Sequence, residues 1–113
     1  MHELSLCRSI YGIVEQSAHG RGVGVIHLQV GRMRQVVPDT LKYCWDLVVQ
    51  STGLEGSVLE VESMPAVVSC RACGTETHLE DVLMVLCGQC GSTDVAVVGG
   101  EQFLLTSIDL VSA

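Results

Sequence analysis

Hydrophobic side chains recur at helical spacing in two stretches of the chain. Within residues 3–18 they follow one another at steps of three and four, which places Leu4, Cys7, Tyr11, Val14 and Ala18 on one face of a predicted helix. A second helix is expected to begin at Pro38 and Asp39, two residues typical of a first turn, and to end at Gly53. Its apolar face is expected to hold Leu41, Cys44, Trp45 and Val48.

Alternating apolar and polar residues predict three strands, over residues 23–30, 58–62 and 102–110. In the first strand, His27 points away from the apolar face, has no acidic or cysteine partner in register, and is expected to be solvated. The last strand could not satisfy its backbone groups if it stood alone. We therefore expect it to return to the sheet that the first two strands form.

The predicted fold class is α+β, with two helices packed on a small three-stranded sheet and a zinc-ribbon module inserted before the last strand. Pro65 precedes the cysteine cluster, and Gly99 and Gly100 follow it. The α+β domain would comprise residues 1–65 plus 100–113, and the inserted domain residues 66–99. A segment of this size lies below the ~40 residues that usually fold unaided, so a metal is expected to supply its folding energy.

Two CxxCG motifs dominate the inserted segment, Cys70-Arg-Ala-Cys73-Gly74 and Cys87-Gly-Gln-Cys90-Gly91. In each motif two thiolates three positions apart can face one ion, and the glycine permits a turn with positive φ. Four sulfurs in a tetrahedron form the closed site that structural Zn²⁺ prefers, so zinc is expected at Cys70, Cys73, Cys87 and Cys90. Iron in a rubredoxin-like site uses the same spacing and stays an alternative.

Composition and charge argue against nucleic-acid binding and against a membrane-spanning protein. The chain has 113 residues, of which 48% are hydrophobic, and 6 Lys plus Arg against 13 Asp plus Glu give a net charge of −7. This charge argues against a domain that grips nucleic-acid phosphates. No apolar stretch approaches the ~20 residues that span a bilayer, and no signal peptide is visible, so we expect a cytoplasmic protein without membrane contact. In that compartment Cys7 and Cys44 are expected to stay reduced and to pack as small apolar side chains.

The N-terminus offers a second possible metal site. The α-amine of Met1, the amide nitrogen of His2 and the His2 imidazole can close fused chelate rings on one ion. A square plane of nitrogen ligands suits Ni(II) or Cu(II). From these residues alone, a histidine that is simply solvated is the alternative.

Three features together resemble the HypA/HybF family of hydrogenase maturation factors. They are the start Met1-His2-Glu3-Leu4-Ser5-Leu6, the pair Val30-Gly31 ahead of Val37-Pro38, and the two CxxCG motifs followed by Ser92. The likeness runs from Met1 to about Asp109. One departure is Gly88, where many relatives have proline, and it is expected to loosen the second motif without removing a ligand.

The resemblance implies a nickel metallochaperone that helps to insert Ni(II) into the large subunit of NiFe-hydrogenase. The family's essential nickel ligand, a histidine at the second position, falls on His2. The terminal amine and nearby backbone amides that complete the plane fall on Met1, His2 and Glu3. A HypB-type GTPase is the other implied partner, zinc is structural, and nickel is transiently bound cargo.

The sequence alone is also compatible with two other functions. One is a zinc-ribbon protein-interaction module that binds no nickel, and the other is a small electron carrier with iron at the four cysteines. The chain carries no Ser/His/Asp set, paired carboxylate motif or nucleotide fingerprint. We therefore expect a protein that is not an enzyme.

Overall fold

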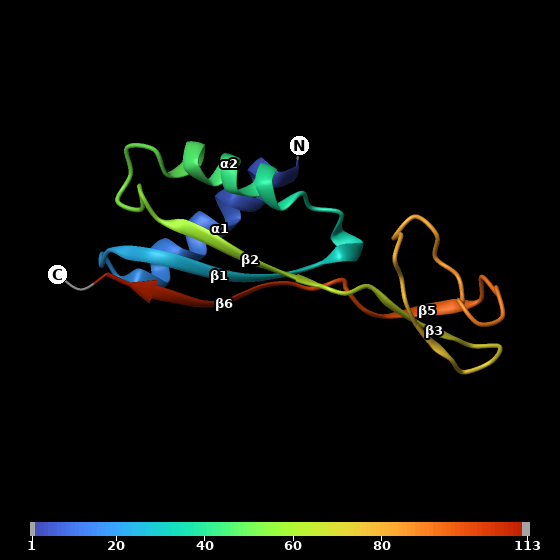
Figure 1. Ribbon diagram of the computed structural model, residues 1–113. Coiled ribbons are helices and arrows are strands. Elements are labelled where there is room, and N and C mark those ends of the chain that lie inside the picture. Colours follow the sequence, from blue (N-terminus) through green and yellow to red (C-terminus); the bar gives the residue numbers. More distant parts are fainter. Residues whose placement is uncertain (1, 112–113) are drawn as a thin grey trace. The chain divides into compact units, whose positions relative to one another are not determined.

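The computed structural model describes residues 2–111 (Figure 1). Its elements are α1 (His2–Ala18), β1 (Val23–Gly31), the 3-10 helix η1 (Arg32–Arg34), α2 (Pro38–Val49), β2 (Val58–Met64), β3 (Val67–Cys70), β4 (Glu76–His78), β5 (Val95–Gly99) and β6 (Phe103–Leu110). The predicted order of helix, strand, helix, strand, cysteine module and strand is confirmed. Within this described part, no helix combines the length and apolar character needed to cross a membrane.

The chain divides into two compact units. The first consists of Met1–Leu28, Val36–Glu62 and Leu105–Ala113, and the second of Gln29–Gln35 and Ser63–Leu104. The second unit thus contains both CxxCG motifs together with a short segment from the middle of the chain. That residues 1–65 plus 100–113 form a nickel-binding domain and residues 66–99 a zinc-binding domain stays a prediction.

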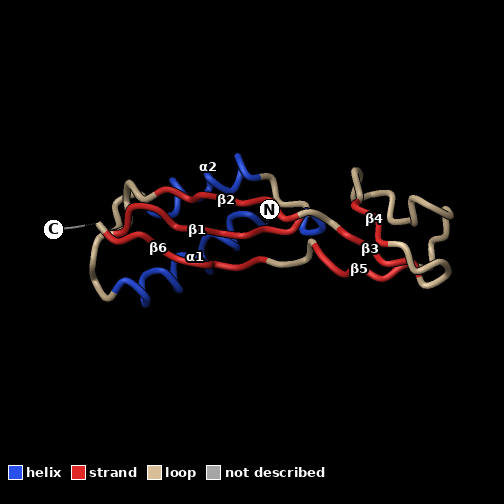
Figure 2. The backbone as a smooth tube through the Cα atoms, turned by 60° about the horizontal axis from the view of Figure 1, so that its bottom comes forward, coloured by secondary structure: helices blue, strands red, loops and turns tan. Residues whose placement is uncertain are grey.

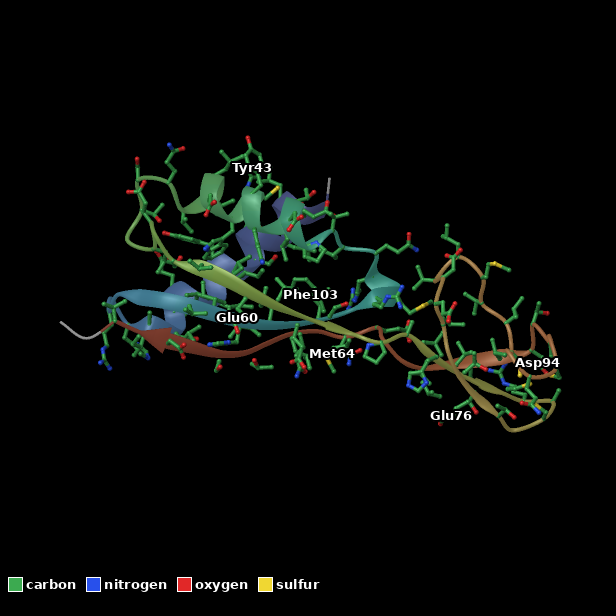
Figure 3. The ribbon with its side chains drawn as sticks, in the orientation of Figure 1. Tyr43, Glu60, Met64, Glu76, Asp94 and Phe103 are labelled. Carbon is green, nitrogen blue, oxygen red and sulfur yellow. The ribbon has the colours of Figure 1, made fainter. Side chains whose placement is uncertain are left out.

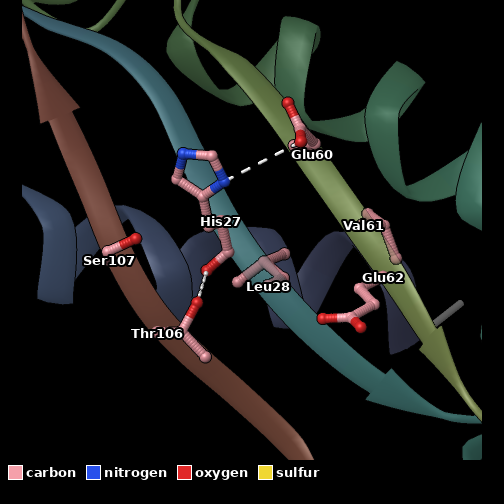
Figure 4. A pocket seen from close by; sticks show the side chains of 7 residues that line it. All are labelled: His27, Leu28, Glu60, Val61, Glu62, Thr106 and Ser107. Atoms are coloured by element: carbon pink, nitrogen blue, oxygen red, sulfur yellow. Dashed lines mark hydrogen bonds and ion pairs between the residues drawn. The ribbon is translucent and has the colours of Figure 1, made fainter.

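In the first unit, a three-stranded sheet carries both helices on one face. Its strands lie in the order β2-β1-β6, and β6 runs opposite to β1 and β2 (Figure 4). Helix α2 makes the crossover that two parallel strands need. Figure 2 shows the other face of this sheet in front, with the helices behind it. The expected α+β fold, including the return of the last strand to the first sheet, is confirmed.

The core of the first unit lies between the helices and the sheet. Its most deeply buried large side chains are Cys7, Val14, Ile26, Leu28, Leu41, Trp45, Val49 and Leu59. The predicted apolar face of α1 is confirmed for Cys7, Val14 and Ala18. Leu4 instead lies at the margin of this face, 37% exposed, and Ile10 takes a buried position that the pattern did not assign.

Helix α2 begins at Pro38 as predicted, but it ends at Val49 and not at Gly53. Ser51 adopts a φ of 63°. The backbone N–H of Thr52 donates to the Val49 carbonyl at 3.0 Å, and the Thr52 hydroxyl donates to the same oxygen at 2.6 Å. The helix stops early because these two groups occupy the carbonyl that a further helical turn would use.

The second unit has a small antiparallel sheet of order β4-β3-β5. Its buried core residues are Ala66, Val68 and Leu79, packed against the half-buried Met33, Val82, Val85, Val95 and Val97. Strands of this length are too short for a period of two to stand out in the sequence. The apolar core is also small, so burial alone provides limited stability.

Residues 29–35 are integral to the second unit. The Arg32 guanidinium donates to the carbonyl of Leu79 at 3.1 Å and to that of Glu80 at 2.8 Å. Met33 packs against the buried core of the unit. The cysteine-bearing unit is therefore completed by a segment that precedes it by some thirty residues in the sequence.

Gly31 lies where two backbone segments pass too closely for a side chain. A Cβ at this position would overlap the carbonyl group of Gly100. We expect Gly31→Ala to lower the free energy of unfolding by about 1–3 kcal/mol, the usual cost of overpacking. Gly12→Ala is the matched control, because a Cβ on this exposed residue of α1 meets nothing within 4 Å. It should raise the free energy of unfolding by about 0.5–1 kcal/mol.

Urea denaturation of the two variants measures both effects. If the two substitutions shifted the midpoint by the same amount and in the same direction, the close approach at Gly31 would be disproved.

Candidate metal centre

The four cysteines of the CxxCG motifs meet in the second unit. The N–H of Gly74 donates to the Cys70 carbonyl and the N–H of Gly91 to the Cys87 carbonyl, each at 2.9 Å. These bonds close a tight turn around each pair. Gly74 and Gly91 have φ of 77° and 75°, which confirms that the glycine of each motif permits a backbone conformation that other residues rarely adopt.

The distances between the four sulfurs fit one metal ion. All four lie within 4.8 Å of one another, and the pairs Cys70–Cys90 and Cys73–Cys87 are 3.6 Å apart. Zn–S bonds of about 2.3 Å in a tetrahedron would set the sulfurs about 3.8 Å apart. The cluster is a metal-binding site whose donor set fits zinc. Among the described residues, no other group of three or more His, Cys, Asp or Glu side chains lies close enough to share an ion.

Hydrogen bonds favour the thiolate form of two of these cysteines. The backbone N–H groups of Cys90 and Gln89 donate to the Cys87 sulfur at 3.4 Å and lower the pKa of Cys87 to about 6. Hydrogen bonds from Thr75 lower the pKa of Cys73. Because the thiolate is the form that binds metal, these contacts prepare the cluster for an ion near neutral pH.

Cys90 shows why the cluster also needs a cation. The Ser92 amide lowers the pKa of Cys90, but the hydrogen bond with the Cys70 sulfur and burial outweigh it and raise the pKa to about 11. Adjacent sulfurs cannot all be negative unless a positive charge offsets their repulsion. A divalent ion at the centre would supply that charge and stabilise every thiolate.

The departure at Gly88 has a structural counterpart. The Gly88 N–H donates to the Thr77 hydroxyl at 3.0 Å, a bond that proline could not make because it has no N–H. Thr77 lies on β4 and thus ties the second motif to the sheet of the unit.

Arg71, between the first two cysteines of the cluster, is neutralised by a partner. Its Nη1 lies 3.0 Å from the Asp94 carboxylate, which Figure 3 labels. Both side chains are exposed, so this pair adds little stability. Arg71 is the only lysine or arginine of residues 66–99, and the pair with Asp94 balances its charge.

Two of the expected nickel residues, His2 and Glu3, lie at the start of α1. Met1 is outside the described residues, and His2 is the first residue of the helix, with a side chain whose position is not described. Glu3 is buried, with 7% of its surface exposed, and its carboxylate accepts a hydrogen bond at 3.5 Å from the N–H of Val37. Val37 is the residue that precedes the first turn of α2. No local sequence pattern predicts this contact between the two helix starts, because 34 residues separate its partners.

Cys7 lies in the core of the first unit, as expected. Its thiol is fully buried and donates to the Leu41 carbonyl at 3.3 Å. Burial, followed by the nearby Cys44 and Glu3, raises the pKa of Cys7 to about 12. The thiol is therefore uncharged at neutral pH and fills space as a small apolar group.

The prediction that His27 lacks an acidic partner is wrong. Its Nε2 lies 3.0 Å from the Asp109 carboxylate on β6, and its Nδ1 lies 3.9 Å from the Glu60 carboxylate on β2. Asp109 is 82 residues away in the sequence, so strand alternation alone could not show the pair. His19 and His78 are exposed, and His78 does not belong to the four-sulfur cluster.

Comparison with known proteins places the chain in a family. Residues 1–110 match the family model described as "HypA: Hydrogenase/urease nickel incorporation, metallochaperone, hypA". The chain is 36% identical over 110 residues to the hydrogenase maturation factor HypA of Trichormus variabilis, covering 97% of this chain and 96% of the relative. It is 38% identical over 112 residues to the HypA of Roseiflexus sp. strain RS-1, covering 96% and 91%.

Solved structures agree at the level of the fold. The solution structure of the Ni metallochaperone HypA from Helicobacter pylori matches over the full length of both chains, with a TM-score of 0.65 and 16% identity. A second solution structure of a HypA protein gives a TM-score of 0.68, also at 16% identity, over 98% of this chain and 97% of that one. With a family model that spans nearly all of its residues, the chain belongs to the HypA family, the metallochaperones of hydrogenase and urease nickel incorporation.

Proposed function

We propose that the protein is a nickel metallochaperone that binds Ni(II) at Met1, His2 and Glu3 and helps to insert it into the large subunit of NiFe-hydrogenase. Membership of the HypA family carries this proposal, because the family match includes the N-terminal residues as well as both CxxCG motifs. A structural Zn(II) at Cys70, Cys73, Cys87 and Cys90 is part of the same proposal. The protein itself catalyses no reaction.

The position of His2 and Glu3 at the start of a helix supports a nickel site made largely of nitrogen. The first amide nitrogens of a helix have no carbonyl partner within it, and His2 and Glu3 are the first two residues of α1. Ni(II) can displace the proton of such an amide and hold its nitrogen in a square plane. The Met1 amine and the His2 imidazole would complete this plane.

The charge at the start of α1 favours Ni(II) binding that can be reversed. The positive end of the helix dipole disfavours a cation by about 0.3–1 kcal/mol. Loss of amide protons offsets this effect, because each lost proton removes one positive charge from the complex. Re-protonation of the same nitrogens then provides a route for release, and acid should weaken nickel binding.

The Glu3 carboxylate has a supporting role in this proposal. It is buried against the start of α2, where it accepts the hydrogen bond from Val37. We propose that Glu3 contributes its backbone amide to the nickel plane, while its side chain fixes the first turn of α1 against α2. A rigid first turn would hold the ligand nitrogens in place.

The zinc site has a different task from the nickel site. A closed site of four sulfurs leaves no position for an exchangeable ligand, so it holds structure. It would add stability to a unit whose buried core contains few residues.

We propose a HypB-type GTPase as the partner in nickel delivery. Cys7 and Cys44 form no disulfide, which suits a reducing cytoplasm.

Changes at the N-terminus test the nickel site directly. Extra residues fused ahead of Met1, or His2→Ala, should abolish tight nickel uptake, because each removes at least one ligand nitrogen. His19→Ala, in the exposed turn after α1, is the control and should bind nickel as the wild type does. Titration calorimetry gives the nickel affinity and elemental analysis the zinc content, which should not change. Unchanged nickel affinity in both N-terminal variants would refute the site.

Glu3→Gln separates the two roles given to Glu3. Glutamine keeps the backbone amide and an oxygen that can accept the hydrogen bond from Val37. The nickel affinity of the variant should therefore stay within about threefold of the wild-type value. A tenfold loss would correspond to about 1.4 kcal/mol. Loss of nickel binding in this variant, with unchanged thermal stability, would instead make the carboxylate a ligand.

Removal of one sulfur tests the zinc site. Cys73→Ser should lose the bound zinc and unfold the second unit, because zinc binding supplies folding energy, while α1 and α2 keep their amide protection. Cys73 is exposed, so the substitution disturbs no packing. Cys44→Ser should retain one zinc per chain. Iron absorption bands in the purified protein, or full zinc content in Cys73→Ser, would contradict the assignment.

A further inference from the structure

His27 lies between the two outer strands of the first unit's sheet. It belongs to the central strand β1, and its ring lies 3.0 Å from Asp109 on β6. On the other side it lies 3.9 Å from Glu60 on β2 (Figure 4). The two interactions use different nitrogens of the ring, Nε2 and Nδ1 respectively. Its backbone carbonyl also accepts a hydrogen bond from the Thr106 hydroxyl at 3.2 Å. One residue therefore contacts both neighbouring strands.

The carboxylates nearest His27 come from the strands of its own sheet. The three strands contain Glu60, Glu62 and Asp109 but no lysine or arginine. Glu62 lines the same surface depression as His27, and the helices lie on the opposite face (Figure 2). Within these three strands, the net charge consequently changes when the His27 imidazole gains or loses its second proton.

The chemistry of imidazole makes the arrangement sensitive to that proton. A doubly protonated ring donates from both nitrogens and pairs with a carboxylate on each side. A neutral ring has one N–H, which the shorter contact assigns to Nε2 and Asp109. The lone pair of Nδ1 then faces the Glu60 carboxylate, and attraction on that side turns into repulsion.

We propose that His27 is a proton-operated clasp that fastens β2 and β6 to β1 when the ring is charged and loosens them when it is neutral. These two strands are the segments by which the chain enters and leaves the cysteine-bearing residues. His27 therefore acts on the two strands that continue along the chain into the second unit. The clasp is independent of the proposed nickel site, because none of its groups belongs to the N-terminus or the cysteine cluster.

The pH range of the clasp follows from the pKa of His27. The hydrogen bond with Asp109 raises this pKa, with burial opposing and the charges of Asp109 and Glu60 adding to the rise. A group whose pKa is raised on folding stabilises the fold fully below its unfolded pKa of about 6.5. That stabilisation is lost as the pH rises through the folded pKa. Nickel binding by amine and amide nitrogens has the opposite pH dependence, so the two effects can be told apart.

NMR titration of nickel-free, zinc-loaded protein tests the clasp. The His27 ring should titrate above about 6.5 in the wild type. Asp109→Asn should move its pKa back toward that value, and Glu60→Gln should move it by a smaller amount. His19→Gln serves as the control and should leave the His27 titration unchanged.

Hydrogen exchange then measures whether the proton holds the strands. Between pH 6 and pH 9, the amide protection factors of β6 and β2 should fall about twofold to fivefold in the wild type, the range expected for one exposed charge pair. The amides of α1 serve as an internal reference. In Asp109→Asn, protection of β6 should be low at pH 6 already and should change little with pH.

Two results would overturn the proposal. One is a His27 ring that titrates at or below its ordinary pKa in the wild type. The other is strand protection that stays constant from pH 6 to pH 9 relative to α1.

Discussion

Four thiols cannot lie within 4.8 Å of one another as thiolates unless a cation offsets their mutual repulsion. The second unit is built around this condition. Turns closed by Gly74 and Gly91 bring two sulfurs to each side of the cluster, backbone amides favour ionisation of Cys87, and Cys90 resists it. Because the surrounding apolar core is small, an ion at the cluster and the shape of the unit depend on each other.

The two metals proposed for this protein call for opposite designs. The proposed resident ion would be held by four sulfurs from two short motifs, with no coordination position left for exchange. The proposed cargo ion would be bound by nitrogens at the very start of a helix, where protons can compete for the same atoms. The buried Glu3 connects the second design to the rest of the first unit, because its carboxylate reaches the start of α2. A release site can thus have firmly placed ligands without being closed.

Charge on the open face of the sheet follows a similar logic at a smaller scale. Three carboxylates occur on strands that carry no lysine or arginine, and one imidazole lies among them. On such a face a single proton changes the balance between attraction and repulsion across three strands. The helices on the other face hold the sheet by apolar packing, which does not depend on pH.

The sequence by itself determined much of this protein. Helical and alternating periodicities predicted both helices and the strands of the first sheet, because burial of one face leaves a local pattern. The return of the last strand to that sheet followed from its unpaired backbone groups. The motif spacing predicted which four cysteines meet, since a tight turn fixes the two sulfurs of each pair. Errors arose where a local residue competed with the pattern, as when Thr52 ended α2 before Gly53.

Only the tertiary structure decided the contacts between distant residues. The pairs His27–Asp109 and Glu3–Val37, and the docking of Arg32 onto the carbonyls after β4, join positions 34 to 82 residues apart. No periodicity records such pairs, because they depend on which strands become neighbours and on how helix starts meet. The sequence therefore predicted the elements and the metal-binding cysteines, and the fold added the polar contacts that tie those elements together.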